Sequence, residues 1–172
     1  GYTGWDYNGQ LDEFALYTSA LSASDVQEHY NNAKNASRTT PYPDLIKQKN
    51  PALYLRLDEP SLQIPVAVNS GTLGSAADGQ ILTGVITARP GAQNPAFSGF
   101  EATNRAVYLN GANGFVSMPA QNLNLGEATI AAWIKRDGDQ PARAAIMFNR
   151  SSTENMATGL GFLDSGNGLS YH

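Results

Sequence analysis

The sequence predicts an all-β protein, an antiparallel β-sandwich with one short helix. Short stretches of alternating apolar and polar residues recur along the 172 residues and are separated by turns rich in glycine and asparagine. The composition agrees, because the chain has 17 glycines and a charged fraction of 15%, well below the ~25% of an average domain. Only one segment has the residue spacing of an amphipathic helix.

The composition also argues against several classes of function. The formal net charge is −4 and no stretch gathers five like charges, so we expect no binding to nucleic acid. The chain has no cysteine, which removes disulfides, thiolate nucleophiles and cysteine-based zinc sites. No apolar run approaches the ~20 residues of a membrane-spanning helix, so we expect no membrane span. The chain begins at Gly1 without a signal peptide, which indicates a piece of something longer.

The helix is predicted from residue 23 to about residue 33. Ser22 is a favourable N-cap, and Asp25 stands three residues later, which is the spacing of a capping box with Asp in place of Glu. Three apolar residues then recur at positions i, i+4 and i+7 and are predicted to form one face of the helix. These residues are Val26, Tyr30 and Ala33.

The strand before the helix is predicted over residues 11–17, LDEFALY. Its alternation places Phe14 and Leu16 on one face, and Asp12 has the same parity, so Asp12 is predicted to point toward an edge of the core. A carboxylate at such a place needs hydrogen-bond donors or a cation. Asp12 is therefore expected either to accept hydrogen bonds from backbone amides of a neighbouring loop or to bind calcium.

The rest of the chain continues in short elements. Residues 35–50 carry prolines and polar side chains without a period, which is typical of a linker. Leucines alternate with more polar residues over 52–58, which predicts a strand. Ala106–Leu109 and Phe115–Met118 are predicted as the two arms of a hairpin. Further strands are predicted over 128–135, 144–150 and 159–163, with another at the end of the chain.

Several of these segments resemble one family. YNGQLDEFALYTSALSASDV at 7–26 is similar to the closing strand and helix of laminin-G-like, concanavalin A-type jelly-roll domains. YLRLDEP at 54–60 resembles the first strand of such domains, and ATIAAWIK at 128–135 resembles a later one. The resemblance implies a concanavalin A-like jelly roll.

The order of the resembling segments is that of two successive repeats. Residues 1–34 resemble the C-terminal strand and helix of a preceding repeat, residues 35–50 a linker, and residues 51–172 the N-terminal half of the next repeat. First and last strands lie near each other in these domains. We therefore expect strand 11–17 to pair in cis with strand 52–58, or else with chain outside these residues.

The resemblance also implies a function. It indicates an extracellular or cell-surface recognition or adhesion module in a tandem array, which binds glycan or protein, contacts neighbouring repeats and is not catalytic. Two alternatives are an accessory carbohydrate-binding domain of a secreted glycosidase and a purely structural repeat of a surface fibre. Catalysis is not expected, because no glutamate is followed two residues later by aspartate, as the E-x-D-x-x-E motif of related glucanases requires. His29 is predicted to be solvated on the helix, which leaves no base for a serine triad.

Candidate site residues are aromatic and acidic. Trp5 and Tyr7 lie in the glycine-rich stretch GYTGWDYNG, and a flat ring can stack on the C–H face of a sugar. Trp133 is instead predicted to pack in the core because small apolar residues surround it. Related jelly rolls often bind calcium between loops, and no other cofactor is expected. The candidate calcium ligands are Asp12, Asp58 and Asp78.

Overall fold

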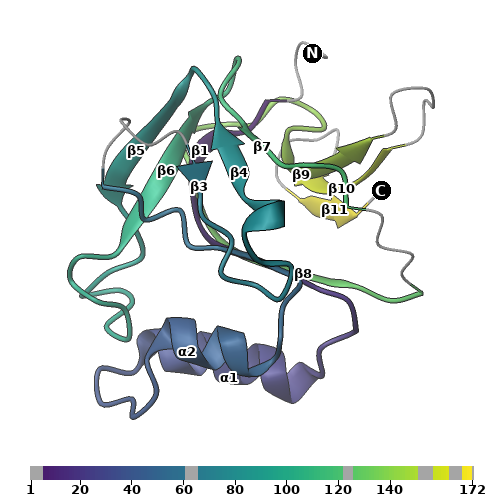
Figure 1. The fold of residues 1–172 in the computed structure, drawn as a ribbon. Helices are drawn as coiled ribbons and strands as arrows, with labels where there is room; N and C mark the ends of the chain where they lie inside the picture. Colours follow the sequence, from purple (N-terminus) through teal and green to yellow (C-terminus); the bar gives the residue numbers. More distant parts are fainter. Residues whose placement is uncertain (1–5, 61–65, 122–125, 151–156, 163–167, 172) are drawn as a thin grey trace.

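The computed structural model describes residues 6–60, 66–121, 126–150, 157–162 and 168–171. Antiparallel strands dominate this part of the chain, which also holds two short α-helices and one 3₁₀ helix (Figure 1). The predicted antiparallel, mostly β class is confirmed, with one helix more than expected. The elements are β1 (Asn8–Tyr17), α1 (Ala23–Lys34), α2 (Tyr42–Gln48), β2 (Leu53–Leu55), β3 (Val66–Ala67), η1 (Gly74–Ala77), β4 (Gly79–Ile81), β5 (Val85–Pro90), β6 (Arg105–Asn110), β7 (Val116–Ser117), β8 (Thr129–Arg136), β9 (Ala145–Arg150), β10 (Ala157–Phe162) and β11 (Leu169–Tyr171).

β1 is the central strand of the largest sheet. β8 pairs with β1 along nearly its whole length and so occupies one edge. On the other side of β1, β6 pairs with its first half and β2 with its second half. β5 then extends the sheet beyond β6. Phe14 pairs with Leu55 and Leu16 with Leu53, which confirms the expected pairing in cis between residues 11–17 and 52–58.

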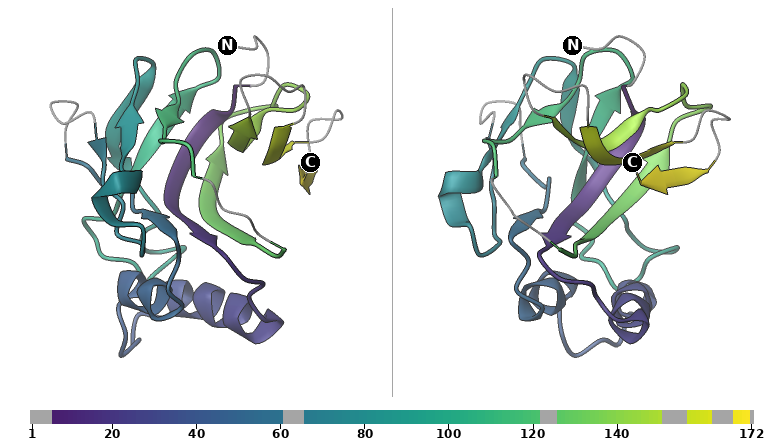
Figure 2. Two further views of the ribbon diagram at one scale, coloured as in Figure 1. Left: turned by 45° about the vertical axis from the view of Figure 1, so that its right-hand side comes forward. Right: turned by 90° about the vertical axis from the view of Figure 1, so that its right-hand side faces the viewer.

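Two three-stranded sheets, β3-β4-β7 and β9-β10-β11, pack against one face of this five-stranded sheet (Figure 2). The apolar layer between them is here called the inter-sheet core. It combines residues that precede and follow the segment 35–50, so both parts of the chain share one core. Its buried members on β1, β2 and β6 are Leu11, Phe14, Leu16, Leu53, Leu55, Val107 and Leu109.

The opposite face of the five-stranded sheet carries a second apolar cluster, here called the helix-side core. It lies under α1, α2 and the loop 91–104, and Figure 1 shows the two helices together beyond the end of the sheet at which β1 finishes. The helices therefore cover only one end of this face. Buried members of the helix-side core are Ala15, Tyr17, Ala33, Tyr42, Ile46, Tyr54 and Phe100.

A β-bulge in β1 decides which side chains enter each core. The pairing of β1 with β8 shifts register between Asp12 and Ala15, and Glu13 has a φ of 51°, in the left-handed region. Leu11 and Phe14, three residues apart, consequently both face the inter-sheet core. The predicted parity was therefore wrong for Asp12, which lies opposite Trp133 on the helix-side face because the extra residue reverses the alternation.

The start of α1 follows the predicted capping box. The Asp25 N–H donates to Ser22 Oγ at 3.1 Å, and the Ser22 N–H donates to Asp25 Oδ2 at 3.1 Å. Two backbone N–H groups at the helix start are thereby satisfied within four residues of chain.

The buried face of α1 differs from the prediction. Val26 and Tyr30 are 53% and 46% exposed, whereas His29 and Ala33 are buried. The expectation that His29 is solvated was therefore wrong, because α1 docks through His29 and Ala33, one turn apart. The His29 ring lies between two tyrosine rings of the helix-side core, and its burial lowers its pKa.

The segment 35–50 contains a helix where the sequence indicated only a linker. α2 begins directly after Pro41, and Pro43 lies in its first turn, where a missing N–H leaves no intrahelical bond unmade. Tyr42, Leu45 and Ile46 are buried. The prolines thus mark the start of a docked helix rather than an irregular connection.

The predicted hairpin between Ala106–Leu109 and Phe115–Met118 was wrong. β6 pairs with β1 and β5, whereas β7 pairs with β4 in a different sheet. The turn between β6 and β7 is closed by Asn110, whose Oδ1 accepts three backbone N–H groups from residues 112–114. The predicted turn after residue 109 is therefore present, but the strands on its two sides belong to different sheets.

Candidate functional site

Two regions of the structure gather polar side chains, and the first is a buried acidic pair at the bulge of β1. Asp12 and Glu13 are 3% and 1% exposed, although they are neighbours in the sequence. The bulge directs both toward the helix side of the sheet. Two adjacent buried carboxylates repel each other and lose hydration, so their partners decide whether the arrangement is stable.

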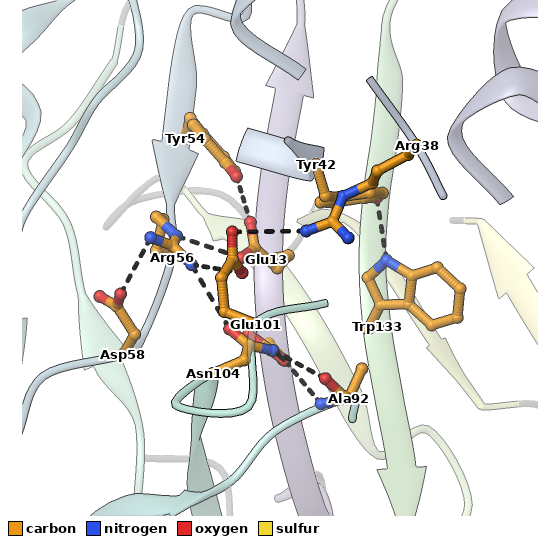
Figure 3. A network of polar contacts seen from close by, with 11 residues as sticks. Glu13, Arg38, Tyr42, Tyr54, Arg56, Asp58, Ala92, Glu101, Asn104 and Trp133 are labelled. Carbon is orange, nitrogen blue, oxygen red and sulfur yellow. Dashed lines mark hydrogen bonds and ion pairs between the residues drawn. The ribbon is translucent and has the colours of Figure 1, made fainter. Parts of the chain in front are cut away.

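Glu13 has a charged and a neutral donor (Figure 3). The Arg56 Nε–H donates to Glu13 Oε1 at 3.1 Å, and the Tyr54 hydroxyl donates to Glu13 Oε2. Both donors come from β2 or the residue after it, so the acid connects the central strand to its neighbour. Burial nevertheless raises the pKa of Glu13 to about 7.

Asp12 is held by the loop 91–104. Its Oδ2 accepts the Ala92 N–H at 3.1 Å and an Asn104 Nδ2–H at 2.7 Å. Its Oδ1 is buried without a hydrogen-bond partner in the described part of the chain. Burial, followed by the charge of Glu13, raises the pKa of Asp12 to about 8. The interpretation of Asp12 as an acceptor for a loop amide is confirmed. The side chain of Asn104 is a second donor, which the sequence analysis did not anticipate.

Arg56 carries the countercharge for the cluster. Besides Glu13 it contacts Asp58 at 3.2 Å and Glu101 at 3.8 Å, and Arg38 reaches Glu101 at 3.6 Å (Figure 3). The network ties β1 and β2 to the loop 91–104. Structural ion-pair networks perturb pKa values as active sites do, and burial keeps both acids of β1 from a dissolved substrate.

Of the two expected ligand-binding aromatics, only Tyr7 lies among the described residues. Trp5 lies outside the described residues. Tyr7 is 2% exposed, its ring stacks on Phe162 with centroids 5.8 Å apart, and its hydroxyl donates to the Gln10 carbonyl at 3.3 Å. This placement in the inter-sheet core does not fit stacking on a ligand.

The three candidate calcium ligands are engaged separately. Asp12 accepts from the loop 91–104, Asp58 pairs with Arg56, and Asp78 accepts the Asn69 N–H at 2.8 Å. Within the described ranges no three histidine, cysteine or acidic side chains lie close enough to hold a metal ion.

Trp133 packs in the helix-side core, as predicted. Its ring meets Phe97 and Phe100 edge-on at centroid distances of 4.7 and 5.6 Å. Its indole N–H donates to the Tyr42 hydroxyl at 2.9 Å, which satisfies the polar atom of a largely apolar side chain (Figure 3). The sequence argument from neighbouring small apolar residues was sound.

The second polar region is a row of side chains across four strands. Ile86 of β5 pairs with Tyr108 of β6, Tyr108 with Gln10 of β1, and Gln10 with Lys135 of β8. We call these four residues the Tyr108 row. The adjacent register positions, such as Leu11 and Ile134, enter the inter-sheet core, so the row points to the opposite face.

The Tyr108 row lies at the end of that face away from the helices. The row crosses β1 at its third residue, whereas the chain runs from the opposite end of β1, at Tyr17, to the start of α1 at Ala23. Ile86 is 44% exposed, Lys135 is exposed, and Gln10 and Tyr108 are half-buried. A surface four strands wide is therefore accessible to solvent.

Tyr108 is fixed in place by groups beside the row. Its hydroxyl lies 2.8 Å from Asn8 Oδ1 and 3.1 Å from Asp137 Oδ2, to which it donates. The hydrogen bond to Asp137 raises the pKa of the Tyr108 hydroxyl. The guanidinium of Arg89 lies 5.6 Å from the centroid of its ring. Sequence reasoning missed this site, because the alternation in RAVYLN and NGQL indicates the face on which Tyr108 and Gln10 lie but not which strands are neighbours.

Comparisons of the chain with protein-family models, with curated proteins and with solved structures give no match. Among the described residues, no helix has the length and apolar character needed to span a membrane.

Proposed function

We propose that this chain is a non-catalytic recognition module that binds glycan at the Tyr108 row. The observation that carries the proposal is the row itself, where an oriented aromatic side chain lies beside amide, carboxylate and cationic groups on an open sheet face. Sugars offer apolar C–H faces and many hydroxyls, so a surface that combines aromatic and hydrogen-bonding groups matches their chemistry. An open surface four strands wide suits an extended saccharide more than a small compact ligand.

The acidic pair of β1 supports a module without catalysis. Glycoside hydrolysis needs two carboxyl groups on either side of the scissile bond, whereas Asp12 and Glu13 are buried side by side and bound to the protein. We expect no release of reducing ends from β-glucan or xylan. Turnover that disappears in the E13Q variant would contradict this part of the proposal.

We further propose that the module is a laminin-G-like, concanavalin A-type jelly roll of an extracellular or cell-surface protein with tandem repeats. The sequence resemblance at 7–26 and 54–60 supports this assignment. The pairing of β1 with β2 is in keeping with it, because the closing and opening strands of such domains are neighbours.

The function is tested by screening the purified chain against immobilised neutral and acidic oligosaccharides, followed by calorimetry with the best ligand. The variant Y108A should weaken binding at least tenfold, because it removes the ring and its fixed hydroxyl. The matched control is Y171A, which removes an exposed tyrosine from β11 in another sheet. No binding to any saccharide, or equal losses in the two variants, would contradict the proposal.

A further inference from the structure

We infer that the ligand of the Tyr108 row is a saccharide chain that bears carboxylates, and that Arg89 and Lys135 bind these groups. The inference rests on the proposed glycan-binding function and names the chemical class of the ligand. Three observations carry it: the orientation of Arg89, the lack of a carboxylate partner for either cation in the described part of the chain, and the spacing between the two cations.

Arg89 is oriented toward this surface before any ligand arrives. Its guanidinium lies 5.6 Å from the centroid of the Tyr108 ring, and the ring is itself held through Asn8 and Asp137. Contact with an aromatic ring reduces the freedom of a long side chain and leaves the N–H donors of the guanidinium for an anion. A planar carboxylate can accept two parallel N–H bonds from such a group.

Neither cation of this surface has a carboxylate partner in the described part of the chain. The ion pairs found there involve Arg38, Lys49 and Arg56. Arg89 and Lys135 take part in none of them, and Lys135 is exposed. In a chain of net charge −4, two unpaired cations on one open face favour an anionic ligand.

The spacing of the cations favours sparse charges on the ligand. Arg89 belongs to β5 and Lys135 to β8, with β6 and β1 between them. Three strand spacings separate them by roughly 14 Å across the sheet. The carboxylate of Asp137 lies 3.1 Å from the Tyr108 hydroxyl and would repel a densely charged polymer. A chain of uronic acid units therefore fits better than a heavily sulfated chain or a nucleic acid.

The inference is tested by measuring affinity for uronate oligosaccharides, namely oligogalacturonate and hyaluronan oligomers, and for fully methyl-esterified oligogalacturonate, heparin and single-stranded RNA. The wild-type chain should bind at least one uronate oligosaccharide at least tenfold more tightly than the esterified, heparin and RNA probes. R89Q should lose at least tenfold in affinity for it and K135Q about threefold to tenfold, while R89K keeps an intermediate affinity. The matched control K47Q removes an exposed lysine on α2 and should stay within twofold of wild type.

The possible failures are distinguishable. Binding to neutral saccharides with no preference for a uronate chain would overturn the inference and leave the proposed function standing. Tighter binding to heparin or RNA, or equal losses in R89Q and K47Q, would also overturn it. Absence of binding to every saccharide would overturn the proposed function itself.

Discussion

Arg56 and Glu13 form two hydrogen bonds at the bulge of β1, one between their side chains and one between their backbones. The Arg56 Nε–H donates to Glu13 Oε1 at 3.1 Å, and the Glu13 N–H donates to the Arg56 carbonyl at 3.2 Å. The side-chain contact compensates a carboxylate that is almost fully buried. The backbone contact continues the attachment of β1 to the segment after β2, at the residue where the bulge interrupts regular register.

The R56M variant should destabilise the fold by roughly 2–4 kcal/mol at pH 8, since it leaves a buried charge without its partner. The loss should be smaller at pH 5.5, where Glu13 can take up a proton because its pKa is raised. Urea unfolding at both pH values measures this. The control K49M breaks the partly exposed pair with Asp25 and should change stability by less than about 1 kcal/mol. Equal effects of the two variants would contradict the assigned role of Arg56.

Stability should depend on pH through Asp12, whose pKa is raised to about 8. The folded chain binds this proton more tightly than the unfolded chain, so the contribution is full below the ordinary pKa near 4 and is lost as pH rises toward 8. Because the lowered pKa of His29 acts in the opposite direction, the informative quantity is the difference between wild type and D12N.

D12N should therefore lose less stability than wild type between pH 5 and pH 8, by roughly 2–4 kcal/mol. Urea unfolding in steps of half a pH unit would measure the difference, with E28Q as an exposed acidic control. A D12N curve parallel to that of wild type would show that Asp12 titrates as it does in the unfolded chain.

The G99A variant should destabilise the protein by roughly 2 kcal/mol, because a methyl group at Gly99 would overlap the backbone of α1 at Asn32 and Ala33. The Gly99 N–H also donates to the Ala33 carbonyl at 2.7 Å, so the loop 91–104 would be displaced from the helix. The control is G126A, where an added methyl group meets nothing within 4 Å. Thermal unfolding of both variants provides the comparison, and a neutral G99A would refute the close approach.

The S22A variant should cost about 1 kcal/mol of stability, since it removes the acceptor for the Asp25 N–H at the start of α1. S22N offers a side-chain oxygen in the same place and should recover most of the loss. Chemical denaturation of the three proteins would test this. An S22N variant as unstable as S22A would indicate that the serine acts through something other than its cap.

Local chemistry was enough to predict several of the individual elements. The Ser22 and Asp25 spacing located the start of α1, because capping involves groups within one turn. The strand predicted over residues 128–135 is observed as β8, which spans Thr129–Arg136. The buried acceptor role of Asp12 also followed from the cost of leaving a carboxylate unpaired.

The Tyr108 row could not be assembled from the sequence. Its four members come from strands whose neighbours are fixed by pairing over long separations, as between β1 and β6. The same reason separates β6 from β7, since a turn signal specifies a reversal of direction and not the sheet in which the next strand pairs.

The sequence by itself determined the mostly β class, the capped helix and the alternation of most strands, because these depend on caps, turns and periodicity within a few residues. The tertiary structure alone decided that Glu13 adopts a positive φ, that His29 is buried and that residues 42–48 form a docked helix. Each of these outcomes is unfavourable or marginal locally and is stabilised by partners distant in the chain. For Glu13 these partners are Tyr54 and Arg56, about 40 residues away along the chain and in direct contact in the fold.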